Sequence, residues 1–405
     1  MPLSIERLVS QGRGLALTPE GKQALVSEVL PGEVVEVAIE REHASYLMAR
    51  ATKVVEANPR RIIPPCPYWG VCGGCDFQWA EDAYQGELKE AIVADALERT
   101  GGVKRGSYDC EEQATHRGWG YRSRARFFVD LHAKQVGFLT RLSNTLVPID
   151  SCPVLVAPLN DLLGDPTHLF DAARGEMFAN RISKNGLVEV AAFADGEQAV
   201  LLDEEIRVEV GPKEFVLSPS VFFQSNLFLL PAMGEHVSSL VEGETVMDLY
   251  SGVGTFASFV EEAGRTVVAV ERQKQCLSFA RRNAPGATFF TEAAESWAKR
   301  QKMAVDTVIV DPPRTGLESS LPSLMASWKP RRIIYVSCNE ASLARDVKRF
   351  GIEGYTVRSL RLFDLYPQTF HTETVVLLSK KNVEPKHTVS IGVDADEYYR
   401  IKNAK

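Results

Sequence analysis

The sequence predicts an α/β protein in which a doubly wound, Rossmann-like sheet follows an OB-like β-barrel and a cysteine-bearing central α+β domain. Three observations lead to this fold class. Short β-branched runs separated by glycine and proline turns fill residues 1–58. Three cysteines follow within ten residues, and strand and helix patterns alternate from residue 245 onwards. We therefore place domains at 1–58, 59–215 and 216–385, followed by a polar tail over 386–405.

The composition limits the class of protein. A chain of 405 residues with 45% hydrophobic and 24% charged content can form two or three packed domains. No uncharged apolar run approaches the roughly 18 residues that a membrane span needs, and the N-terminus lacks a signal pattern. We expect a cytoplasmic monomer without a membrane partner. The net charge of -7 means that any nucleic-acid surface must be a local one.

The barrel predicted over 1–58 has strand patterns such as those at 34–39 and 46–51, with glycine turns between them. OB-like barrels are common RNA-binding platforms. A purely structural barrel is equally compatible with this composition.

Cys66, Cys72 and Cys75 lie in a segment with three glycines, which allow tight backbone wrapping. The fourth candidate ligand is Cys152, because a cysteine followed by proline is common among cluster ligands. Zinc ligands usually form two separated pairs, so a three-plus-one arrangement favours an iron–sulfur cluster over zinc. Zinc and the absence of metal remain alternatives.

Two segments have less specific patterns. The helical pattern over 81–100 ends at two glycines and predicts only packing. The segment 117–141 mixes aromatic side chains with basic ones, which suits contacts to phosphates and stacking on bases, although a solvated strand face is equally compatible. Its basic residues are Arg117, Arg122, Arg124, Arg126, Lys134 and Arg141.

The parallel sheet carries features of an adenosine-binding site. A strand over 245–250 ends at Tyr250 and enters a glycine turn that lacks the third glycine of the dinucleotide motif. The next strand ends at Glu271, which can accept hydrogen bonds from ribose hydroxyls. S-adenosylmethionine fits this pair of features best. Gln224, before a predicted helix, can bind a uracil or the cofactor, but taken alone it more simply caps the helix.

Three further residues stand at strand ends where chemistry gathers in such sheets. Two prolines after Asp311 aim this carboxylate into the cleft, Cys338 follows the strand over 331–337, and Glu373 opens the closing strand. A thiolate that adds to C6 of uracil activates C5 for methylation, and a carboxylate must then remove the C5 proton. Cys338 and Glu373 suit these two roles, while Asp311 or a nearby amide would position the ring.

Five motifs in order resemble the RNA uracil-5-methyltransferase family: those at 223–226, 248–256, 311–314, 337–339 and 371–373. The resemblance implies a class I S-adenosylmethionine-dependent methyltransferase domain, with Cys338 as nucleophile and Glu373 as base. It also implies a TRAM-like domain over 1–58 that binds RNA. Around the cofactor it implies Gln224, Tyr250, Glu271 and Asp311, and as ligands of a 4Fe-4S cluster it implies Cys66, Cys72, Cys75 and Cys152.

The choice of RNA depends on the cluster and the barrel. Family members with both features tend to act on large-subunit ribosomal RNA, so we expect 23S ribosomal RNA as the substrate. The alternatives are a transfer RNA uracil-5-methyltransferase, an RNA cytosine-5-methyltransferase, and a non-catalytic RNA-binding or redox-sensing protein.

Overall fold

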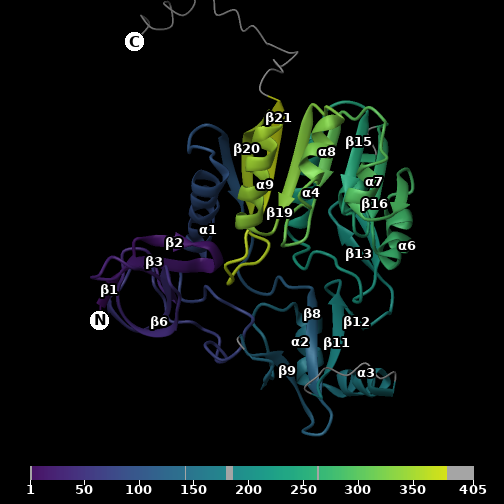
Figure 1. Cartoon of the computed structure of the whole chain (residues 1–405). Coiled ribbons are helices and arrows are strands. Elements are labelled where there is room, and N and C mark those ends of the chain that lie inside the picture. The colour runs from purple at the N-terminus through teal and green to yellow at the C-terminus, as the bar shows by residue number, and fades with distance from the viewer. Residues whose placement is uncertain (1, 142, 179–185, 262–263, 381–405) are drawn as a thin grey trace, which may run out of the picture.

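The computed structural model describes residues 2–141, 143–178, 186–261 and 264–380, so the tail predicted over 386–405 lies outside the described residues. Figure 1 shows a barrel at the N-terminal end, a long sheet covered by helices, and a smaller sheet below the long one. None of the helices in the described segments combines the length and apolar character that a membrane crossing requires.

The N-terminal strands form a six-stranded sheet in the order β1-β5-β6-β4-β3-β2, which confirms the predicted barrel. Alternate side chains along β4 and β6, among them Val26 and Ala49, are fully buried because one face of each strand points into the barrel. The strands are β1 (Pro2–Ser4), β2 (Arg7–Val9), β3 (Arg13–Leu17), β4 (Gln23–Ser27), β5 (Val34–Glu42) and β6 (Tyr46–Glu56).

The large sheet has the order β17-β16-β15-β18-β19-β21-β20-β7. The first five strands are mutually parallel, and β21 runs antiparallel between β19 and β20. The strands are β7 (Asp109–Ala114), β15 (Thr245–Leu249), β16 (Thr266–Glu271), β17 (Thr288–Thr291), β18 (Thr307–Val310), β19 (Arg332–Ser337), β20 (Tyr355–Phe363) and β21 (Glu373–Lys380). This arrangement confirms the predicted doubly wound sheet.

Helices cover both faces of this sheet because its strands are apolar on both sides. Neighbouring residues of a strand join different cores: Val246 packs with α4 to α6, whereas Met247 packs with α7 to α9. The helices are α4 (Leu230–Leu240), α5 (Thr255–Glu261), α6 (Lys274–Asn283), α7 (Ala294–Ala298), α8 (Leu321–Ser327) and α9 (Glu340–Ile352).

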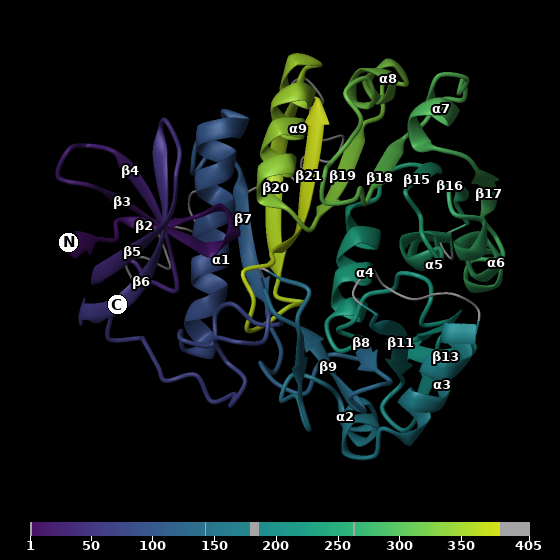
Figure 2. The ribbon, with the colours of Figure 1, turned by 60° about the horizontal axis from the view of Figure 1, so that its bottom comes forward.

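The segment 59–215, predicted as a central domain, supplies elements to more than one part of the molecule. Strand β7 extends the large sheet, pairing in parallel with β20. Helix α1 (Asp82–Ala96) stands between the barrel and α9 (Figure 2). Its Leu88 belongs to the barrel core, whereas its Val93 belongs to a core of the large sheet. Helix α1 therefore joins the two parts.

The smaller sheet has the order β10-β9-β8-β11-β12 and packs against two helices. A separate hairpin, β13 with β14, packs on the large sheet beside α6. These elements are β8 (Arg124–Asp130), β9 (Gln135–Leu139), β10 (Leu146–Pro148), α2 (Ala157–Gly164), α3 (Thr167–Phe178), β11 (Val188–Ala194), β12 (Ala199–Leu201), β13 (Ile206–Val210) and β14 (Lys213–Leu217).

Candidate active site

Cys338 and Glu373 lie close together where the interior strand β19 of the large sheet ends and the neighbouring strand β21 begins. Strand β19 ends at Ser337, which pairs with Thr374 of the antiparallel strand β21. The ladder ends at this pair, and Cys338 and Glu373 are the next residues along the two chains, close enough for their charges to interact. The site thus lies at the carboxyl end of the parallel strands, where ligands gather in open α/β sheets.

Both groups lie in a desolvated environment. Glu373 is 1% exposed, and within the described part of the chain neither of its carboxylate oxygens has a hydrogen-bond partner. Burial and the nearby Asp311 raise the pKa of Glu373 well above its usual value. Burial, together with Glu373 and Asp311, raises the pKa of the Cys338 thiol to about 12. This environment therefore favours the neutral thiol over the thiolate.

A cation opposes these shifts. Arg314, which follows Asp311 by three residues, lowers the pKa of both Cys338 and Glu373. Its Nη2 lies 3.1 Å from Nε2 of His371, whose pKa falls to about 3 because of burial and the charge of Arg314. His371 is therefore a neutral imidazole that accepts a hydrogen bond from Arg314. Both residues lie in motifs of the sequence, at 311–314 and 371–373, but nothing in the sequence predicts that they pair.

The glycine turn after β15 is built around Glu271. Its carboxylate, 8% exposed, accepts the N–H groups of Gly252 at 3.0 Å and Gln273 at 2.7 Å. Gly254 has a φ of 81°, and a Cβ there would lie 3.3 Å from the Ala280 backbone. A larger residue at 254 would therefore push α6 away from the turn.

Tyr250 and Asp311 lie at neighbouring strand ends. Tyr250 has a left-handed backbone with a φ of 66°, and its hydroxyl hydrogen-bonds to Glu318. The N–H of Asp311 donates to the carbonyl of Leu249 at 3.3 Å, and burial raises the pKa of the Asp311 carboxyl to about 7. Asp248, behind them, is fully buried, and burial raises its pKa to about 8.

The segment before α4 contains two side-chain amides, Gln224 and Asn226, which have different partners. Neither amide caps α4, whose N-cap residue Leu229 has no side-chain capping hydrogen bond, so the capping role considered for this segment is wrong. Asn226 accepts the N–H of Phe228 at 3.2 Å in the turn before the helix. Gln224 instead accepts the hydroxyl of Tyr366 at 2.8 Å. Tyr366 belongs to the loop that leads to Glu373, so Gln224 faces the same site.

Cys66, Cys72, Cys75 and Cys152 line one cavity of about 330 Å³, together with Arg122. All four thiols are half-buried, and burial raises the pKa of Cys75 to about 12. In the segments that the structure describes, no group of three or more His, Cys, Asp or Glu side chains is arranged to hold a metal ion. The fold therefore brings four soft sulfur donors to one cavity without assembling a closed metal site.

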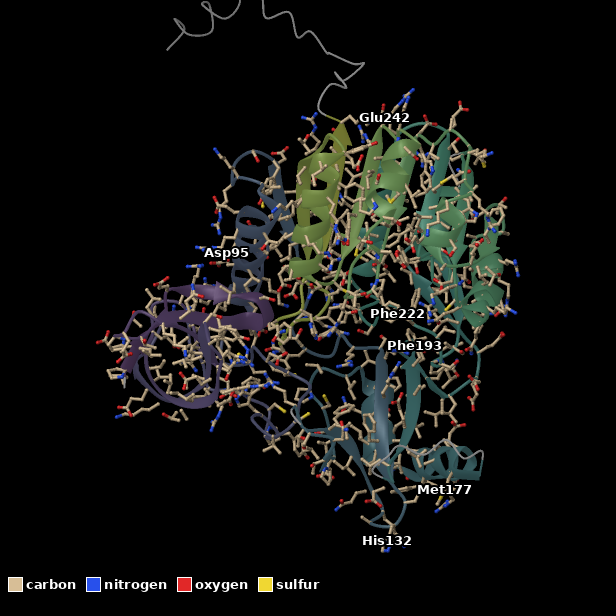
Figure 3. All side chains as sticks on the ribbon, in the orientation of Figure 1. Asp95, His132, Met177, Phe193, Phe222 and Glu242 are labelled. Atoms are coloured by element: carbon tan, nitrogen blue, oxygen red, sulfur yellow. The ribbon has the colours of Figure 1, made fainter. Side chains whose placement is uncertain are left out.

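Several of the basic side chains after residue 116 contact other side chains of the protein. Arg126 and Arg141 pair with carboxylates, the latter with Asp76 at 2.5 Å. The guanidinium carbon Cζ of Arg117 lies 4.0 Å from the ring centroid of Phe228. Phe222, 57% exposed, lies where the smaller sheet meets the large one (Figure 3).

Known proteins resemble this chain in sequence over most of its length. Residues 298–381 match a family model described as tRNA (Uracil-5-)-methyltransferase, and residues 1–52 match the TRAM domain. A 23S rRNA (uracil(1939)-C(5))-methyltransferase of Shewanella amazonensis is 32% identical over 94% of this chain and 96% of its own. That of Aromatoleum aromaticum is 31% identical, with 94% and 100% covered.

The fold also matches a solved structure over most of its length. The crystal structure of Pyrococcus abyssi tRNA (uracil-54, C5)-methyltransferase in complex with S-adenosyl-L-homocysteine aligns with a TM-score of 0.69 at 24% identity. The alignment covers 93% of this chain and 100% of that one.

Proposed function

The chain belongs to the S-adenosylmethionine-dependent RNA uracil-5-methyltransferases, and from this premise we propose that it methylates C5 of a uridine in 23S ribosomal RNA through Cys338 and Glu373. The observation that supports the chemical proposal is the pairing of Ser337 with Thr374, next to which lie the Cys338 thiol and a Glu373 carboxyl group that has no hydrogen-bond partner among the described residues. The names of the relatives from Shewanella and Aromatoleum favour ribosomal RNA. The name of the Pyrococcus protein makes transfer RNA the alternative.

In the proposed mechanism the Cys338 thiol first loses its proton to a carboxylate of the site. Asp311 is a candidate acceptor, because its charge interacts with the Cys338 thiol. The Cys338 sulfur then bonds to C6, and the displaced electron pair moves to the ring as an enolate. S-adenosylmethionine supplies the methyl group that C5 takes up. The Glu373 carboxylate removes the C5 proton, and the pair left behind expels the Cys338 sulfur.

We propose that Gln224, Tyr250, Glu271 and Asp311 contribute to the cofactor site. Both oxygens of Glu271 already accept backbone N–H groups, which orient its remaining lone pairs. A carboxylate oxygen can accept more than one hydrogen bond, so ribose hydroxyls fit the same group. The tight turn at Gly252 and Gly254 allows the backbone to approach the ligand closely.

We further propose that Cys66, Cys72, Cys75 and Cys152 hold a 4Fe-4S cluster with a structural role. Four thiols around one cavity supply the donor set that such a cluster takes, and Arg122 in the lining offsets its negative charge. Cys72→Ser should abolish the visible absorbance of the cluster and lower the melting temperature. Unchanged thermal stability with lost activity would contradict the structural role.

Tritium release from RNA labelled at uracil C5 tests the proposed function, with ribosomal and transfer RNA as separate substrates and Cys338→Ala as the control. We expect release from ribosomal RNA that disappears in the variant. Release from transfer RNA alone would overturn the substrate. No release from either RNA, despite bound S-adenosylmethionine, would overturn the reaction.

A further inference from the structure

The loop between β20 and β21 contains a fully buried glutamine, Gln368, that the proposed reaction does not use. Its backbone is in the left-handed region with a φ of 67°, which a side chain with a Cβ adopts only where its surroundings enforce it. The loop leads into Glu373, so a fixed backbone conformation at Gln368 affects the position of the proposed base.

The side chain of Gln368 is tied to helix α1. Its Nε2 donates to Oδ1 of Asp82 at 2.7 Å, and its Oε1 accepts from Nε2 of Gln85 at 3.0 Å. The backbone N–H of Gln368 also donates to Oε1 of Gln85 at 2.7 Å. Gln85 and Gln368 therefore form a reciprocal pair, and both are 1% exposed or less.

The carbonyl of Gln368 is tied to a second segment. It accepts the N–H groups of Asp76 at 2.8 Å and Phe77 at 2.9 Å, directly after Cys75. The neighbouring carbonyl of Pro367 accepts the buried hydroxyl of Tyr121 at 2.9 Å. Helix α1 and the segment after Cys75 both lie far from the loop in sequence. They hold Gln368 through its side chain and through its carbonyl, respectively.

The backbone of Glu373 is held by its pairing with Phe363 of β20, but none of the residues that the structure describes gives its side chain a polar anchor. Within the described residues its carboxylate oxygens have no hydrogen-bond partner, so only packing and the backbone fix its direction. We propose that Gln368 is a positioning residue that locks the loop and so aims Glu373 at Cys338. This inference rests on the proposed function, because it assumes that Glu373 acts on a substrate bound at Cys338.

The test compares Gln368→Gly with the wild-type protein. Glycine accepts the left-handed backbone and keeps the N–H and carbonyl, so the variant removes only the side-chain hydrogen bonds. We expect kcat for methyl transfer to fall about 10- to 100-fold, with KM for RNA changed less than about twofold, because misplacement affects the transition state. Amide hydrogen exchange over 364–372 should accelerate in the same variant.

Three further variants separate positioning from general damage. Asp82 is exposed, so Asp82→Ala should fold normally and still lower kcat, whereas Asp82→Asn keeps an acceptor and should restore most of it. Gln301→Ala removes a half-buried glutamine that accepts the N–H of Met303, and should change neither readout. A kcat of Gln368→Gly within about threefold of wild type, or a rise in KM alone, would overturn the proposal.

Hydrogen exchange separates failure of this inference from failure of the proposed function. If the wild-type protein transfers no methyl group to uracil, the proposed function is wrong. Exchange over 364–372 still reports whether the side chain of Gln368 holds the loop in place. Unchanged exchange in Gln368→Gly would show that the side chain of Gln368 does not hold the loop, whatever the activity.

Discussion

Burial raises the pKa of both Glu373 and Cys338, so it favours the neutral form of each group. For a base, this environment has an advantage: a carboxylate whose pKa is raised takes a proton more readily once it is ionised. For a nucleophile it is a cost, because only the thiolate attacks. Arg314 reduces that cost, since its positive charge favours the thiolate.

Replacing the proposed base with its uncharged analogue should trap the reaction after methyl transfer. Glu373→Gln keeps the shape of the side chain but cannot remove the C5 proton, so the bond between Cys338 and C6 persists. We expect turnover to fall at least about 100-fold, and a protein–RNA adduct to survive in a denaturing gel. The double variant with Cys338→Ala should form no adduct. Normal turnover by Glu373→Gln would rule out its role as the base.

Removing the cation should make Cys338 less reactive. In Arg314→Gln the pKa of the thiol rises further, because the charge that lowers it is gone, so the thiolate fraction at a fixed pH falls. A rise of one pKa unit lowers that fraction about tenfold. We expect iodoacetamide to label the Cys338 peptide up to about tenfold more slowly at pH 8, as measured by mass spectrometry.

Arg300→Gln is the matched control for this labelling, because Arg300 is exposed and pairs with Glu292 instead. Equal labelling rates in Arg314→Gln and wild type would show that the guanidinium does not stabilise the thiolate.

At the scale of elements, α1 holds the loop 364–372, between β20 and β21, through a buried ion pair. Lys89 Nζ lies 2.5 Å from Oδ1 of Asp364 and donates to the carbonyl of Tyr366 at 2.9 Å. Neither side chain of the ion pair is more than 6% exposed. Burial lowers the pKa of Lys89, and the negative charge of Asp364 opposes this shift.

Lys89→Met should therefore leave a buried carboxylate without its partner and cost about 3–5 kcal/mol of unfolding free energy. We expect a clear fall in melting temperature and in methyl transfer. Adding Asp364→Leu should recover most of the stability, because the unpaired charge is removed. Lys299→Met breaks an exposed pair with Glu295 and should cost at most about 1 kcal/mol. A loss for Lys89→Met no larger than that of Lys299→Met would refute the argument.

The sequence predicts those features whose cause is local. Cys338 at a strand end, the glycine turn after β15 and the strand–helix alternation all depend on neighbouring residues, and the structure has them where the sequence places them. The role of α1 has no such signal, and the sequence predicts only packing for it. Gln368 bonds to Gln85, 283 residues away, so its role depends on the tertiary fold.

At the scale of the whole molecule, the barrel is attached to the rest through α1 and through the loop before Glu373. Arg7 of the barrel pairs with Asp95 of α1 at 2.9 Å, and Asp95 lies on the side of α1 toward the barrel (Figure 3). Gly12, between β2 and β3, lies directly against Phe77 and Phe370. Phe370 belongs to the loop 364–372 that precedes Glu373, so this contact connects the barrel to the proposed active site.

A methyl group at Gly12 should disturb both parts. Gly12 has a φ of 65°, and a Cβ there would lie 2.4 Å from the Phe77 ring and 2.9 Å from Phe370. Gly12→Ala combines left-handed strain with overpacking, which typically costs about 1–3 kcal/mol. Gly21→Ala is the matched control, because Gly21 has a φ of 79° but no atom within 4 Å of the new Cβ. We expect both variants to melt at lower temperature, and only Gly12→Ala to lose methyl transfer as well. Equal losses in the two variants would mean that the contact between barrel and loop carries no functional weight.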